Sequence, residues 1–107
     1  MIRQGKATSA GVTQDILDLI ARMDGGLHSY IHLCADRALA QAATADVEIA
    51  AGIYKGPLHG VPIAVKDLCY TTFAPTRAGT TIYKDFLPTY NATVVDRLET
   101  AGAVILG

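Results

Sequence analysis

One lysine stands where this sequence could carry out chemistry. Lys66 ends an apolar run, Val61 to Val65, and is followed by Asp67. The run is too short for a buried helix and is rich in β-branched residues, so it predicts a strand that is apolar on both sides. Pro62 stands near its first residue, where a missing N–H is tolerated. Such strands lie inside covered sheets, and α/β folds gather active-site groups where these strands end.

An amine at such a strand end can act as a base if it loses its charge. A solvated lysine has a pKa of about 10.4, so roughly one molecule in 2,500 is neutral at pH 7. Lowering that pKa to about 7 requires the charge to be disfavoured by about 4 kcal/mol, which burial can supply. Lys66 is therefore a candidate general base. The alternative is a solvated lysine at a strand end, with Asp67 beside it as a weak surface partner.

Three blocks of the sequence resemble a known enzyme family. They are Gly56–Asp67 (GPLHGVPIAVKD), Pro75–Thr80 (PTRAGT) and the pair Asn91–Leu98 (NATVVDRL) and Ala101–Gly107 (AGAVILG). In their order and spacing they are similar to the N-terminal part of the amidase-signature family, and the resemblance runs from about Val12 to Gly107.

The resemblance implies a mechanism for Lys66. In the family, the lysine that matches it belongs to a Ser-cisSer-Lys triad and relays a proton through one serine to activate a second, nucleophilic serine. The reaction is amide cleavage by acyl transfer through an acyl-enzyme, and it implies no cofactor. The substrate would be a small-molecule amide. Its identity stays open, because relatives act on aliphatic, aromatic, lipid or urea-derived amides or, as the A subunit of the tRNA-dependent amidotransferase, on glutamine.

The serines are where this sequence departs from the family. The triad serines of the family lie further along in a Gly/Ser-rich segment, whereas this chain contains only Ser9 and Ser29. We expect Ser9 in a turn or helix cap and Ser29 in a strand, and neither as a nucleophile. A lysine base without a nucleophile and oxyanion donors lacks most of the apparatus of acyl transfer. We therefore expect an N-terminal portion that is inactive alone and is completed by the missing C-terminal portion. The alternatives are a non-catalytic binding or scaffolding module and the amidotransferase A subunit.

Composition and charge exclude several classes of partner. Nine basic and ten acidic residues give a net charge of −1, which argues against direct binding to nucleic acid or to an anionic membrane. No run of about 18 apolar residues is present to cross a bilayer. Cys34 and Cys69 are interpreted as free thiols in a reducing, cytoplasmic compartment. His32 and Cys34 are the only close pair of possible ligands, so we expect no metal site. The full-length enzyme could form an oligomer.

The first half of the chain is expected to build part of an α/β fold. The predicted class is the N-terminal part of an α/β/α sandwich with a mixed, partly parallel sheet, formed by one partial domain over residues 1–107. Residues 1–10 are expected to be a loosely ordered lead-in. An apolar stripe predicts a helix from Val12 that ends at Gly25–Gly26. Leu27–Leu33 is expected to be a short strand. Ala35–Ala51 is expected to be an alanine-rich helix whose charged residues face solvent.

The second half is expected to return the chain to the same sheet. Leu68–Pro88 is predicted to be a long irregular excursion near the lysine, in which Arg77 is either a surface residue or a reader of a substrate carboxylate. Asn91 is expected to cap a helix that ends at Ala101, and Ala103–Leu106 is expected to be a strand. A strand, a long connection with a helix and a second strand are typical of parallel pairing.

Overall fold

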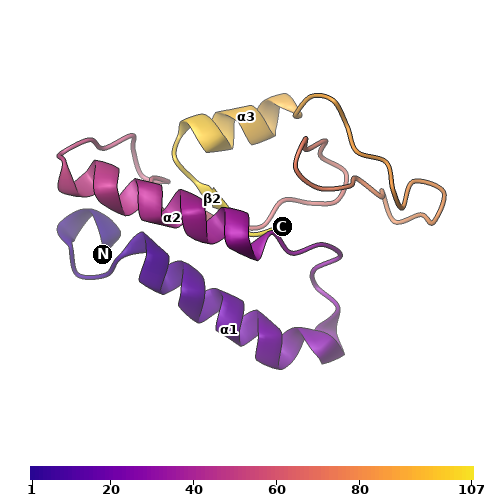
Figure 1. Ribbon diagram of the computed structural model, residues 1–107, viewed down its shortest axis with the longest axis horizontal. Helices are drawn as coiled ribbons and strands as arrows, with labels where there is room; N and C mark the ends of the chain where they lie inside the picture. Colours follow the sequence, from indigo (N-terminus) through magenta and orange to yellow (C-terminus); the bar gives the residue numbers. More distant parts are fainter.

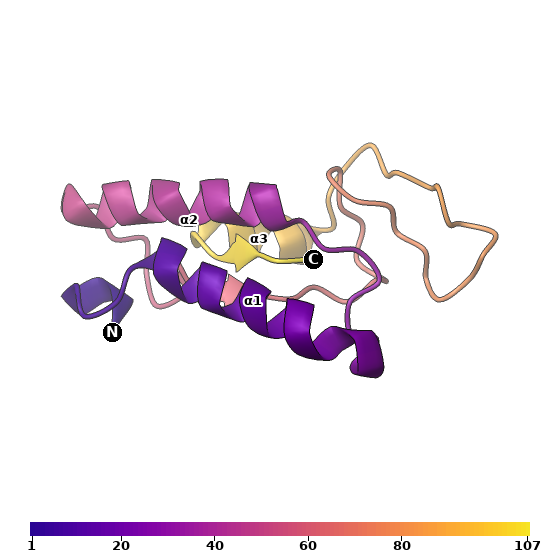
Figure 2. The same ribbon diagram turned by 60° about the horizontal axis from the view of Figure 1, so that its bottom comes forward.

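The computed structural model describes residues 1–107 and confirms an α/β architecture with a parallel sheet. In chain order the elements are η1 (Ile2–Gln4), α1 (Ser9–Leu27), α2 (Ala35–Ala50), β1 (Pro62–Ile63), α3 (Thr93–Thr100) and β2 (Val104–Ile105). The helices α1 and α2 run side by side (Figure 1), and β2 packs against both of them, with α3 behind it in the second view (Figure 2). The excursion between β1 and α3 projects away from this body at one end (Figures 1 and 2).

The core lies between α1, α2 and β2. One buried cluster joins the three elements and consists of Leu17, Ala38, Ala42, Val104 and Leu106. The two alanines of α2 are completely buried, and they have no side chain beyond Cβ. The helix can therefore lie close against the strand, as its composition predicts.

Main-chain hydrogen bonds join β1 to β2 over a longer stretch than the two residues of each strand. These bonds run from Gly60 N to Gly102 O (2.8 Å), Val104 N to Val61 O (2.9 Å), Leu106 N to Ile63 O (2.9 Å) and Val65 N to Gly107 O (2.8 Å). Pro62 is paired with Val104 in register, but the bonds to β2 come from its neighbours. Its missing N–H therefore costs the sheet nothing. The strands are shorter than predicted, yet the bonded ladder spans both predicted runs.

The helix α1 begins and ends outside its predicted bounds. It starts at Ser9, and it continues through Gly25 and Gly26 to Leu27. Thr8 caps its start, since the Thr8 hydroxyl accepts a hydrogen bond from Gly11 N (3.0 Å). The carboxylate of Asp46 in α2 accepts hydrogen bonds from Ser9 N (2.6 Å) and Ala10 N (2.9 Å). A carboxylate satisfies the unpaired N–H groups at a helix N-terminus and interacts favourably with the helix dipole. The expectation that residues 1–10 are loosely ordered is wrong at its end, because Ser9 and Ala10 belong to α1 and Ser9 is fully buried.

The predicted strand over Leu27–Leu33 is wrong, because Leu27 ends α1 and residues 28–34 are an irregular connection. The carboxylate of Asp24 accepts hydrogen bonds from Ser29 N (2.6 Å) and Tyr30 N (3.2 Å), which hold the chain as it leaves α1. The first of these bonds lowers the pKa of Asp24 below its usual value. At the other end of the connection, Cys34 N donates to Leu106 O (2.7 Å). The segment thus meets the end of β2 without pairing as a strand.

The charged residues of α2 make specific contacts, although the sequence predicts that they face solvent. Asp36 is exposed as expected, but Arg37 forms an ion pair with Glu99 of α3. Glu48 accepts a hydrogen bond from the ammonium of Lys55 (2.8 Å), and its second oxygen lies 2.8 Å from Nε2 of His59. Together with Asp46, these residues bind α2 to α1, to α3 and to the segment that precedes β1.

His59 is buried at the amino-terminal end of the sheet. Its side chain is 0% exposed, and its Nδ1 accepts a hydrogen bond from Lys55 N (3.2 Å). The proton is therefore on Nε2, which donates to Glu48. Gly102 follows α3 with φ of 80°, and a Cβ atom there would lie 2.6 Å from Cδ2 of the His59 ring. Glycine at this position adopts the positive φ of the turn without strain and leaves room for the buried ring.

The expected cap of α3 is also wrong. The residue at the N-cap is Ala92, which makes no side-chain capping bond. Asn91 instead accepts a hydrogen bond from Thr72 N (2.8 Å) and donates to Asp96 Oδ1 (3.0 Å). Its side chain thus joins the start of the excursion to α3.

Replacing Gly102 with alanine tests the contact with His59, and Gly52 provides a matched control. Both glycines follow a helix with φ near 80°, but a Cβ at Gly52 would have no atom within 4 Å. We expect Gly52→Ala to lower the free energy of unfolding by about 1–2 kcal/mol through backbone strain alone. We expect Gly102→Ala to lower it by about 1–3 kcal/mol more, because the added methyl overpacks the site. Urea unfolding measures both, and equal losses would contradict the contact.

The Glu48 cluster predicts a dependence of stability on pH. The hydrogen bond from Lys55 holds the pKa of Glu48 below its usual value in the folded chain. The resulting stabilisation is complete above the unfolded value of about 4.3 and is lost as the pH falls through the lower folded value. We expect Glu48→Gln to be less stable than the wild type at about pH 6, and the difference to shrink toward about pH 3.

Urea unfolding at a series of pH values measures this difference. Asp15→Asn is the control, because Asp15 is exposed, lies away from the ends of α1 and forms no ion pair. It should follow the wild type at every pH. A difference between Glu48→Gln and the wild type that stays constant with pH would show that Glu48 does not act through its charge.

Candidate active site

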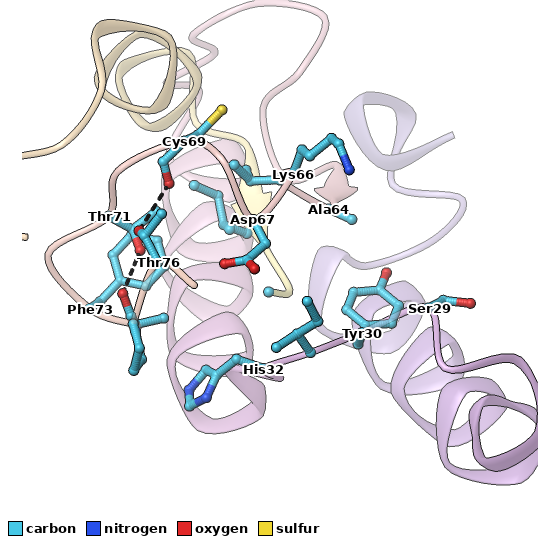
Figure 3. A pocket seen from close by; sticks show the side chains of 16 residues that line it. Ser29, Tyr30, His32, Ala64, Lys66, Asp67, Cys69, Thr71, Phe73 and Thr76 are labelled. Atoms are coloured by element: carbon cyan, nitrogen blue, oxygen red, sulfur yellow. Dashed lines mark hydrogen bonds between the residues drawn. The ribbon is translucent and has the colours of Figure 1, made fainter. Parts of the chain in front are cut away.

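A hollow of about 320 Å³ lies at the carboxyl ends of both strands. Four segments line it: residues 29–32 from the connection after α1, residues 64–67 after β1, parts of residues 69–76 in the excursion, and Ile105 and Gly107 at the end of β2 (Figure 3). Parallel pairing places the two strand ends at the same edge, so the hollow lies where the sequence predicts active-site groups to gather.

Lys66 lines this hollow, but it is exposed. The chain turns directly after it, because its carbonyl accepts hydrogen bonds from Leu68 N (2.7 Å) and Cys69 N (2.9 Å). The ion pairs of the structure do not include its amine, which points in a different direction from the carboxylate of Asp67 (Figure 3). Any burial that discharges this amine must therefore come from outside these 107 residues.

Asp67 binds the excursion, and the interpretation of it as a surface partner of Lys66 is wrong. Its carboxylate accepts hydrogen bonds from Arg77 N (2.7 Å) and Gly79 N (3.5 Å). Its main-chain carbonyl accepts a third from Ala78 N (3.0 Å). The residue next to the candidate base therefore holds a turn ten to twelve residues further along the chain.

The structure does not bring a serine into contact with Lys66. Ser9 is the first residue of α1, not its cap, and its hydroxyl donates to Gly60 O (2.7 Å) away from the hollow. Ser29 lines the hollow from an irregular connection and not from a strand. Its main-chain N–H is held by Asp24, but its hydroxyl makes no hydrogen bond to Lys66.

The walls of the hollow are mainly apolar or neutral. Tyr30 is half-buried, and this burial raises the pKa of its hydroxyl. Phe73 lies under the guanidinium of Arg37, whose central carbon is 3.7 Å from the ring centre. Thr71 is buried, and its hydroxyl donates to Ala74 O (3.0 Å). Sequence reasoning identified the excursion near Lys66 but not these wall residues, because no periodic pattern marks them.

Three other predicted features can be placed. Arg77 does not line the hollow, and its side-chain Nε is buried without a partner. Cys34 and Cys69 are both free thiols, and burial raises the pKa of Cys34. His32 lines the hollow, but no group of three metal-binding side chains occurs in the structure. None of the helices combines the length and the hydropathy required to cross a membrane.

Comparison with known proteins decides the family. The family model described as Amidase matches residues 11–107. This chain belongs to the Amidase family. The match covers all three sequence blocks and the whole hollow.

Similar proteins cover the chain completely but are much longer. "Putative amidase AmiD" of Mycobacterium tuberculosis (strain ATCC 25618 / H37Rv) is 58% identical over 107 residues, which are 100% of this chain and 22% of that protein. The A subunit of glutamyl-tRNA(Gln) amidotransferase from Thermobifida fusca (strain YX) is 45% identical over 99% of this chain and 21% of its own length. The structure of native peptide amidase from Stenotrophomonas maltophilia matches 99% of this chain and 22% of its own, with 38% identity and a TM-score of 0.92.

Proposed function

We propose that this chain is the N-terminal portion of an amidase that cleaves carboxamides by serine acyl transfer, with Lys66 as the base of a Ser-cisSer-Lys triad. The observation that carries the proposal is the position of Lys66, which lines a hollow at the carboxyl ends of two parallel strands and whose amine forms no ion pair. Family membership supports the class of reaction.

The proposal requires residues that this chain does not contain. Ser9 is committed to Gly60, and Ser29 makes no bond to Lys66, so both triad serines must come from the part of the enzyme that follows the matched region. That part must also cover Lys66, since an amine accepts a proton at neutral pH only after its charge has been disfavoured. The 107 residues alone should therefore be inactive.

The walls support a neutral carboxamide as substrate. Among the side chains that line the hollow, only those of Lys66 and Asp67 carry a formal charge, and the lining also includes the imidazole of His32. The carboxylate of Asp67 is occupied by main-chain N–H groups, and Arg77 lies outside the lining. No cation other than the proposed base is therefore placed to bind a substrate carboxylate.

The A subunit of the tRNA-dependent amidotransferase is the second candidate. It is supported by the relative from Thermobifida fusca, while the higher identity to the mycobacterial protein favours the amidase. A non-catalytic module is the third, and the absence of a partnered serine supports it. In each case we infer a protein of the reducing cytoplasm that works without a cofactor, metal, direct nucleic-acid contact or membrane contact, and the two free thiols support that compartment.

A chimera tests the proposal. These 107 residues replace the matching 22% of the mycobacterial relative, and ammonia release from a panel of small carboxamides is measured for the chimera and for the parent protein. We expect Lys66→Ala to lower kcat/KM by at least about 10³-fold, as removal of a triad member does.

The controls separate chemistry from folding. Lys84→Ala removes an exposed lysine and should retain full activity. Urea unfolding of the chimera shows whether Lys66→Ala remains folded, because activity is compared only between folded proteins. Full activity in the folded Lys66→Ala chimera would end the proposal, and glutamine-dependent transfer without free hydrolysis would favour the amidotransferase.

A further inference from the structure

We propose that Asp67 is a positioning residue that fixes one wall of the substrate hollow through the turn at residues 77–79. The inference rests on the proposed function. Three consecutive main-chain N–H groups, those of Arg77, Ala78 and Gly79, donate to this one residue. Two of the bonds reach its carboxylate, at 2.7 and 3.5 Å, and the third reaches its carbonyl at 3.0 Å.

The conformation of the turn explains why it needs such a partner. Ala78 has φ of 51° and Gly79 has φ of 70°, so two successive residues occupy the left-handed region. A residue with a Cβ atom is uncommon there, and it stays there only when its surroundings hold it. Main-chain N–H groups that point to one side form a concave site for an anion, and here the N–H groups of Arg77 and Gly79 donate to the Asp67 carboxylate.

The turn is continuous with the wall of the hollow. Pro75 and Thr76 precede it directly and line the hollow. Thr76 is held by a hydrogen bond from its N–H to Phe86 O (2.9 Å), but the chain on its other side is held by Asp67. The Thr76 hydroxyl also donates to Cys69 O (3.4 Å). Because Asp67 follows Lys66 in the chain, its bonds to the turn link the proposed base directly to this wall.

Other roles for Asp67 fit the geometry less well. Its carboxylate is directed away from the Lys66 amine and forms no ion pair with it (Figure 3). It belongs to no group of metal-binding side chains. Since its oxygens accept N–H bonds from the turn, it acts on a substrate through the wall and not on the reacting atoms.

Three variants of the chimera with the mycobacterial relative test this role. Asp67→Ala removes both carboxylate bonds, and Asp67→Asn keeps one oxygen to accept the N–H of Arg77. Asp85→Ala is the matched control, because Asp85 lies on the same excursion with an exposed side chain. Hydrogen exchange is measured at the amides of residues 77–79, and kcat and KM are measured with a small carboxamide across pH.

We expect Asp67→Ala to raise amide exchange at the turn by about tenfold or more, since bonds to a charged acceptor are lost. We expect its KM to rise on the order of tenfold, because the wall no longer holds the substrate in place. The pH dependence of kcat/KM should not change, since Lys66 is intact. Asp67→Asn should recover most of the loss, and Asp85→Ala should match the wild type.

Two results would overturn the role, and they differ from failure of the proposed function. Unchanged exchange at residues 77–79 in Asp67→Ala would show that the carboxylate does not hold the turn. Faster exchange with a lower kcat but an unchanged KM would indicate only a smaller folded fraction, and hence a merely structural residue. A folded wild-type chimera that cleaves no carboxamide would remove the proposed function and the role toward substrate with it.

Discussion

The parallel ladder between residues 60–65 and 102–107 is the constraint on which the rest of the structure depends. Its four main-chain bonds span 2.8 to 2.9 Å and fix the register of β1 against β2. Since the strands run in the same direction, their carboxyl ends come together, and the hollow forms between those ends and the segments that follow them. Lys66 acquires its place from this pairing: Val65 is bonded to Gly107, so the next residue must emerge at the hollow.

Carboxylates that accept N–H groups from other segments hold the surrounding elements. Asp46 of α2 binds the first N–H groups of α1, Glu48 holds the ring of His59 beside Gly102, and Asp67 holds the turn at residues 77–79. Each of these carboxylates accepts a hydrogen bond from a main-chain N–H group or from the His59 ring. A buried N–H group without an acceptor would lower the stability of the fold. The small alanine-rich core is thus supplemented by polar contacts between elements that are distant in the sequence.

Local pattern predicted the elements that carry the site. The helix over Ala35–Ala50, the strand before Lys66 and its parallel partner all follow from apolar runs and from glycines at their ends. The failures involve hydrogen bonds that the apolar pattern does not reveal, some of them to residues remote in sequence. Thr8 caps α1, and Asp46 of α2 binds its first N–H groups. Asp24 binds Ser29 and Tyr30 locally, whereas Leu106 O accepts from Cys34 N. Asn91 bonds to Thr72 and so does not cap α3.

The reactivity of Lys66 tests most directly whether this geometry creates a base. Amine-selective labelling at pH 7, with and without a competing carboxamide, compares Lys66 with the exposed Lys84 in the 107-residue chain and in the complete chimera. The account predicts similar labelling of both lysines in the short chain, and faster, carboxamide-protected labelling of Lys66 in the chimera, where desolvation favours the neutral amine. Labelling of Lys66 that stays equal to that of Lys84 in the active chimera would contradict it.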